Sequence, residues 1–238
     1  MIYKRDGLPS VEKAFRAIDG AIAGLMQSAL SGPASVISEV DRFRMVRGKT
    51  LAMLGEVSDE EAQWSPRPGV WSIAQVADHL LRSDELYLEQ FRRLIQMARE
   101  GKNTPIRIGF REIDTSLAGI PREVMKFFEG PVRAIGQLMP HAVREAIIRH
   151  PIMPALNPGA SEPRPDLVRE KLRADLAASL IAVENLLCAP MPRNVEGPTL
   201  DHPLLGNNSL PQLFRILIAH EQRHQGQIAN LRSGAALR

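Results

Sequence analysis

The chain has 238 residues, of which 44% are hydrophobic and 24% charged, with a net charge of +3 and a pI near 9.3. This is the composition of an ordinary globular protein. The length suits one large domain, or a domain with an extension, and is enough to bury a real core. Aromatic residues make up only 5% of the chain. The long periodic segments contain few β-branched runs, so helices packed on helices are favoured.

The distribution of charged and apolar residues argues against a nucleic-acid partner and against a membrane-spanning segment. Basic residues are dispersed, and the densest group has acidic residues around it: Arg42, Arg44, Arg47 and Lys49. We interpret this group as a solvated helix face and predict no nucleic-acid partner, which would need a concentrated basic stripe with aromatic residues. The apolar run 21–26 is too short to cross a membrane. Arg16 and Asp19 interrupt what would be the core of a signal peptide.

Cys188 is the only cysteine. A disulfide framework and a thiolate metal cluster are therefore excluded. We interpret Cys188 as a small buried hydrophobic residue, and we expect a cytoplasmic protein.

The first half of the chain is predicted to be helical with short breaks. A helix is expected over residues 10–31, ended by Gly32-Pro33. Residues 1–33 are therefore treated as an N-terminal extension to a main domain that spans residues 34–238. A second helix is predicted over residues 34–56.

Two capping-box patterns frame the next segment. Ser58 with Glu61 and Ser72 with Gln75 each have the three-residue spacing at which two side chains satisfy free backbone N–H groups. Between them, residues 64–72 hold both tryptophans among prolines and a glycine, and we expect the indoles to plug one end of a helical core. Ser72 begins a helix predicted to run to residue 100.

Residues 101–163 are predicted to form a long irregular connection. Eight prolines divide this segment into short pieces, with helix expected on either side of Gly130-Pro131. His141 and His150 have no regularly spaced partner and are interpreted as surface residues. A connection of this length often carries a lid or a substrate wall.

The last part of the chain is predicted to hold two further helices. One spans residues 166–187, and a loop rich in proline and glycine follows it over residues 190–208. The final helix is expected over residues 209–231, with a capping box at Ser209 and a C-terminal cap at Gly234.

The final helix carries a histidine pair on its apolar face. At about 100° per residue, His224 lies within the apolar stripe, and His220 and Glu221 lie near its edges. Arg215, Gln222 and Arg223 are placed pointing away from the stripe. Imidazoles four residues apart can share a metal ion. Burial of both rings without a shared ligand would strand polar nitrogens, so the pair predicts metal binding.

The pair also reads H-E-x-x-H, the zincin motif in which the glutamate is a general base. A zincin usually takes its third ligand from downstream, but no residue after His224 is His, Asp, Glu or Cys. A third protein ligand must therefore come from upstream. His79, in the second turn of the helix that Ser72 begins, lies at the border of that helix's apolar stripe.

Several short pieces, in this order and spacing, resemble the DinB-like (DinB/YfiT-like) superfamily of metal-binding four-helix bundles over about residues 34–233: Trp64–Pro66–Pro68–Trp71–Ser72, His79-Leu80, His202-Pro203-Leu204-Leu205-Gly206, His220-Glu221-Gln222-Arg223-His224 and Gln227-Ile228. The resemblance implies an all-α four-helix bundle in which His79 joins His220 and His224 around a divalent metal ion, often zinc or nickel. It also implies a frequent homodimer. Characterised members include isomerases and transferases that depend on small thiols. The extra N-terminal helix and the long segment 101–163 depart from a minimal bundle.

Three histidines leave at least one coordination position open, whereas a closed structural zinc site normally has four protein ligands. We therefore expect an enzyme that acts on a small-molecule substrate. The resemblance implies that it is a transferase or isomerase dependent on a low-molecular-weight thiol. The alternatives are a hydrolase that uses metal-bound water and a non-catalytic metal-binding stress-response module. Glu221 either accepts a proton in catalysis, or forms a salt bridge or a hydrogen bond to a histidine.

Overall fold

The computed structural model of the chain describes residues 33–109, 124, 126–150, 161–188 and 190–235. The helix predicted over residues 10–31 lies outside these residues, so the division between residues 1–33 and the main domain stays a prediction. None of the helices in the described part of the chain is long and apolar enough to cross a membrane.

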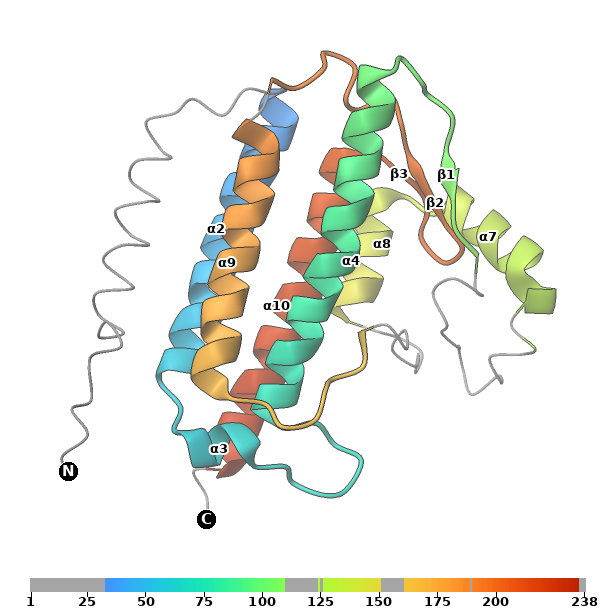
Figure 1. Cartoon of the computed structure of the whole chain (residues 1–238). Coiled ribbons are helices and arrows are strands. Elements are labelled where there is room, and N and C mark those ends of the chain that lie inside the picture. Colours follow the sequence, from blue (N-terminus) through green and yellow to red (C-terminus); the bar gives the residue numbers. More distant parts are fainter. Residues whose placement is uncertain (1–32, 110–123, 125, 151–160, 189, 236–238) are drawn as a thin grey trace.

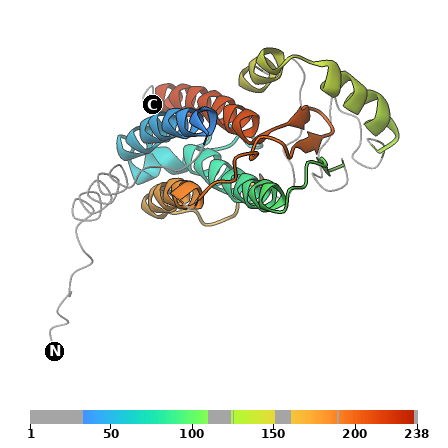
Figure 2. The same cartoon turned by 90° about the horizontal axis from the view of Figure 1, so that it is seen from above.

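Four long helices form the body of the molecule: α2 (Ala34–Gly55), α4 (Ile73–Arg99), α9 (Arg169–Cys188) and α10 (Leu210–Ala235). Helices α2 and α4 lie diagonally across the bundle, and each packs against both α9 and α10 (Figures 1 and 2). Helices α4 and α10 run in opposite directions (Figure 1). The prediction of an all-α four-helix bundle is confirmed.

Local capping signals place two of the helix starts. Ser58 begins the short helix α3 (Asp59–Gln63) with a complete capping box, and Ser72 begins α4 in the same way. Both starts agree with the prediction, because a capping box depends only on residues three apart. The two tryptophans of the intervening loop pack against the buried residues at this end of the bundle, as predicted.

Two other helix boundaries differ from the prediction. Helix α9 begins at Arg169 rather than Asp166, because the φ of Asp166 is +54°, outside the right-handed helical region. Gly234 does not cap α10, because the helix continues to Ala235. A Cβ atom at Gly234 would lie 3.0 Å from the indole of Trp64. Gly234 therefore makes room for the Trp64 ring rather than ending the helix.

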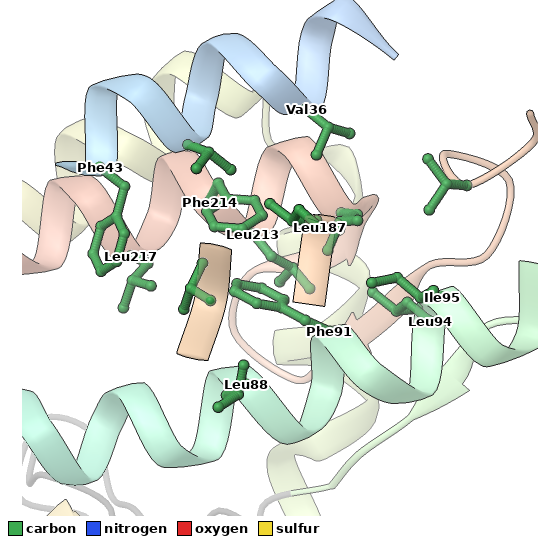
Figure 3. Packing of buried hydrophobic residues seen from close by; sticks show 14 of the residues in the cluster. Val36, Phe43, Leu88, Phe91, Leu94, Ile95, Leu187, Leu213, Phe214 and Leu217 are labelled. Atoms are coloured by element: carbon green, nitrogen blue, oxygen red, sulfur yellow. The ribbon is translucent and has the colours of Figure 1, made fainter. Parts of the chain in front are cut away.

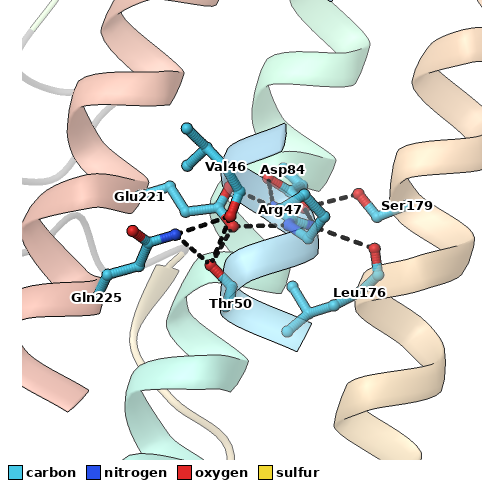
Figure 4. Close-up of polar contacts among 8 residues, drawn as sticks. All are labelled: Val46, Arg47, Thr50, Asp84, Leu176, Ser179, Glu221 and Gln225. Atoms are coloured by element: carbon cyan, nitrogen blue, oxygen red, sulfur yellow. Dashed lines mark hydrogen bonds and ion pairs between the residues drawn. The ribbon is translucent and has the colours of Figure 1, made fainter. Parts of the chain in front are cut away.

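A layer of polar side chains divides the buried interior into two apolar clusters. The first cluster includes Phe43, Phe91 and Phe214, with the last two rings stacked at a centroid distance of 4.4 Å (Figure 3). The second cluster includes Leu54 and Leu80 together with residues of α9 and α10. Between them lie the residues that we call the polar layer: Arg47, Thr50, Asp84, Ser179, Glu221 and Gln225 (Figure 4).

The connection between α4 and α9 forms an arm beside the bundle. It contains a 3₁₀ turn (Lys126–Phe128), helix α7 (Glu129–Leu138) and helix α8 (His141–Arg149), and α8 packs along α10. Helix α7 runs unbroken through Gly130-Pro131, contrary to the prediction, because Pro131 falls in its first turn, where no intrahelical N–H donor is needed.

A small sheet that the sequence analysis did not predict joins the arm to the bundle. Strand β2 (Leu200–His202) pairs in parallel with β1 (Ile106–Arg107) and antiparallel with β3 (Gly206–Asn208). Arg133 of α7 donates to the carbonyl oxygens of Asp201 and Ile108, at 3.0 and 2.6 Å. Hydrogen bonds from this buried guanidinium group therefore connect α7 to the sheet and to the residue that follows β1.

The turn between β2 and β3 approaches α7 closely at Gly206. This residue has a φ of +64°, and a Cβ atom added to it would lie 2.5 Å from the carbonyl oxygen of Gly136. The Gly206→Ala variant is therefore expected to lose about 1–3 kcal/mol of unfolding free energy, from backbone strain and overpacking. Urea denaturation measures this loss, and limited proteolysis should show earlier cleavage within the arm.

Gly48→Ala is the matched control, because Gly48 lies within α2 and has nothing within 4 Å of an added Cβ. Alanine there should be neutral or stabilising. Equal stability of the two variants would contradict the close-approach explanation.

Candidate metal centre

Three histidine side chains from two helices meet at the interface of α4 and α10. The Nε2 atom of His220 lies 3.1 Å from Nε2 of His79 and 3.2 Å from Nε2 of His224. One ligand atom from each ring can be chosen so that all three lie within 4.8 Å of one another. The antiparallel packing of α4 and α10 brings the second turn of α4 beside His220 and His224. The structure thus brings together the three residues that the sequence and the resemblance singled out.

Hydrogen bonds at the far side of two rings fix which nitrogen faces the centre. Nδ1 of His79 lies 2.7 Å from the carbonyl oxygen of Ser161, and Nδ1 of His224 lies 2.9 Å from Oε1 of Gln227. Each Nδ1 must carry the proton, because both partners are acceptors. The Nε2 atoms of His79 and His224 therefore present lone pairs to the centre, as in the metal sites where a second-sphere acceptor orients the imidazole.

His220 completes the cluster without such a partner. Its Nδ1 atom is buried and has no hydrogen-bond partner in the described part of the chain. A neutral ring has one N–H, so Nε2 of His220 can donate to only one of the two lone pairs beside it, and Nδ1 is then left as a bare acceptor. A cation bound by the three Nε2 atoms removes this conflict. The arrangement therefore fits a divalent metal ion.

Burial keeps the three imidazoles neutral. Burial lowers the pKa of His79, although the hydrogen bond to Ser161 opposes the shift. The pKa of His224 falls to about 3, and that of His220 falls well below the usual value; burial is the main cause in both, and the neighbouring histidines add to it. Neutral imidazole is the form that binds metals.

An ion pair holds the backbone that orients His79. The buried carboxylate of Asp78 accepts hydrogen bonds from the backbone N–H of Arg164, at 2.7 Å, and from the Nε–H of Arg164, at 3.0 Å. These bonds tie the segment that begins at Ser161 to the residue that precedes His79. The carbonyl of Ser161 is thereby held where it accepts the Nδ1 proton of His79.

Glu221 lies in the polar layer rather than among the histidines. Its carboxylate accepts hydrogen bonds from Nε of Arg47 at 2.8 Å, from Nη2 of Arg47 at 3.0 Å, and from Oγ1 of Thr50 at 2.6 Å (Figure 4). It is fully buried. Of the two roles expected for Glu221, the structure displays the salt bridge, with both carboxylate oxygens engaged.

Two further side chains lie beside the histidines. The ring of Trp71 lies 4.9 Å from that of His79, so the loop tryptophan forms a wall of the cluster as well as covering the core. The positive charge of Arg223 lowers the pKa of all three histidines, although the angular analysis placed Arg223 pointing away. Sequence reasoning placed Arg223 outside the group, because an angle around the helix axis does not show how a long side chain is directed.

His202 and the two arm histidines lie apart from this group. Nδ1 of His202 accepts hydrogen bonds from the backbone N–H groups of Leu204 and Leu205, and burial lowers its pKa to about 4. His202 therefore stabilises the turn between β2 and β3. His141 is half-buried and His150 is exposed, and neither joins the cluster.

Comparison with known proteins identifies the family. The family model described as the DinB superfamily matches residues 42–228, which span α2 to α10 and all three clustered histidines. Comparison with curated proteins and with solved structures gave no match. Since the matched region covers most of the chain and contains most of the bundle together with its histidine cluster, the chain belongs to the DinB superfamily.

Proposed function

We propose that His79, His220 and His224 bind a divalent metal ion, zinc or nickel, and that this centre is the active site of an enzyme acting on a small-molecule substrate. The observation that carries the proposal is the convergence of three Nε2 atoms, two of which are fixed as lone-pair donors by Ser161 and Gln227. Among the described residues, no fourth His, Cys, Asp or Glu joins the group. Three protein donors are typical of catalytic sites, which keep a position free.

The reaction proposed is transfer or isomerisation that depends on a low-molecular-weight thiol. A metal ion held by three neutral imidazoles supplies a Lewis acid that stabilises thiolate near neutral pH. The chain's own contribution is to hold the donors and shape the approach to them. Ser161 and Gln227 orient two rings, and the Trp71 indole gives the site one apolar wall.

A panel of thiols tests the reaction class. The cobalt-loaded protein should bind cysteine, glutathione, mycothiol or bacillithiol with the appearance of a sulfur-to-metal absorption band, and should turn over an electrophile only when the thiol is present. Hydrolysis of esters or amides without any thiol would instead support the hydrolase alternative, in which water takes the open position. Metal binding with neither reaction would support a non-catalytic stress-response module.

The remaining properties in this proposal concern location and assembly. The single cysteine, Cys188, is in keeping with a cytoplasmic protein. The homodimer is carried over from the resemblance to the DinB-like superfamily, and sedimentation of the metal-loaded protein tests it. The dispersed basic residues argue against a nucleic-acid partner.

A further inference from the structure

The charges around the histidine cluster are unbalanced. The two carboxylates next to cluster histidines in the sequence, Asp78 and Glu221, are both engaged by arginines, Arg164 and Arg47 respectively. Neither is among the groups that gather at the centre. Neutral imidazoles and a divalent cation therefore leave the centre positively charged, with no protein carboxylate in the described cluster to offset it.

Arg223 adds a further positive charge at the edge of this centre. It follows His220 by three residues and directly precedes His224, so on the helix it lies about 60° to one side of His220. Residues three apart on a helix have Cβ atoms about 5–6 Å apart, so the Arg223 side chain begins beside that of His220. The side chain is partly buried.

Several buried or partly buried arginines of the described chain pair with carboxylates, whereas Arg223 does not. Arg44 pairs with Glu184, Arg47 with Asp84 and Glu221, and Arg215 with Glu39. Arg223 is partly buried beside two of the cluster histidines, yet it makes no hydrogen bond or ion pair with any described residue. Burying a cation without an anion costs free energy, so such a group points to a ligand that supplies the missing charge.

We propose that Arg223 binds an anionic oxygen group, a carboxylate or a phosphate, on the small molecule that occupies the metal site. This assignment rests on the proposed function, because it places the anion on the ligand of the metal. The planar guanidinium can donate two parallel hydrogen bonds to such a group. Arg223 is thus a specificity-determining residue, and neutral substrates of the same shape are selected against.

Two thiols matched in length test the proposal by binding rather than by turnover. Mercaptopropionate ends in a carboxylate and mercaptopropanol ends in a hydroxyl group. The cobalt-loaded protein should bind the acid about tenfold or more tighter than the alcohol, as expected for a charge-assisted pair of hydrogen bonds. Dissociation constants come from titration of the visible absorption. Arg223→Gln should remove the preference and leave cobalt content and the affinity for mercaptopropanol unchanged.

Arg232→Gln is the matched control, since Arg232 lies on the same helix and pairs with Glu56 at the surface. This variant should keep the preference. Retention of the preference in Arg223→Gln, or an equal loss in both variants, would overturn the assignment to Arg223. An unaltered preference together with reduced cobalt content would do the same.

A second experiment distinguishes failure of the proposed thiol chemistry from failure of the anion-binding inference. If neither thiol binds to any variant although cobalt does, the proposed thiol reaction fails, and inorganic phosphate and acetate become the probes. Calorimetric binding of either anion to the wild-type protein and to Arg232→Gln, but not to Arg223→Gln, supports the anion site. No difference among the three proteins refutes it.

Discussion

The His224→Ala variant is expected to lose its bound metal ion. His224 is one of the three donors proposed for the metal ion, and its Nε2 atom lies 3.2 Å from that of His220. Changing groups that merely support ligands costs about 10–100-fold in metal affinity, so loss of a ligand should cost more than about a hundredfold. Metal analysis of protein purified without a histidine tag, together with competition against a chelator, measures the effect. Metal-dependent stabilisation, which is about 2.7 kcal/mol at a hundredfold excess over the dissociation constant, should also disappear.

Two companion variants sharpen this test. His150→Ala changes an exposed histidine of the arm and should leave metal affinity intact. His79→Ala keeps the H-E-x-x-H pair but removes the donor contributed by α4, and it should fail to bind metal in the same way as His224→Ala. Full affinity in His79→Ala would show that the α10 pair suffices, and would favour the zincin interpretation of the H-E-x-x-H motif, in which the protein is a metallopeptidase.

The Arg47→Met variant is expected to lose about 3–5 kcal/mol of unfolding free energy, the usual cost of removing one partner from a buried ion pair. Arg47 is completely buried, and burial alone would lower its pKa, but the carboxylates of Asp84 and Glu221 outweigh burial and raise it. Without Arg47, two buried carboxylates face each other with no cation between them. Urea denaturation in the presence of a chelator measures the loss separately from metal binding.

Arg42→Met provides the control on the same helix. Arg42 is 49% exposed and pairs with Glu39, so its replacement should change stability by no more than about 1 kcal/mol. Comparable losses in the two variants would contradict the role assigned to the polar layer.

Glu221→Gln separates the two roles expected for Glu221. The amide keeps the shape of the side chain, and Arg47 retains Asp84, so a smaller loss of about 1–3 kcal/mol is expected, with metal content unchanged. Turnover abolished in a variant of unchanged stability would instead favour proton transfer by Glu221.

The sequence was most informative where a structural signal depends on neighbouring residues. The capping boxes at Ser58 and Ser72 were read from residues three apart, and both are present. The four-residue spacing of His220 and His224 likewise placed both rings on one helix face. The resemblance, rather than periodicity, linked them to His79, because nothing local to α4 shows which side chains of α10 it faces.

The sequence was least informative for structural features that depend on residues far apart in the chain. The interpretation of Arg47 as part of a solvated helix face is wrong, since its partners Asp84 and Glu221 lie far away in the chain. A charge on a helix gives no local sign of a buried counter-charge elsewhere. The strands of the small sheet are two or three residues long, too short for an alternating pattern to be recognised.

The polar layer also limits how far α10 can turn or slide within the bundle. Contacts among aliphatic side chains are non-directional, and a helix held by them alone would tolerate displacement along its neighbours. The two-pronged bond from Arg47 to Glu221 is directional, and a rotation by one residue, about 100°, would break it. The same rotation would carry His220 and His224 away from α4. A single-residue insertion in α10 ahead of His220 would therefore lower both the stability of the bundle and its affinity for a cation, although it would replace neither His220 nor His224.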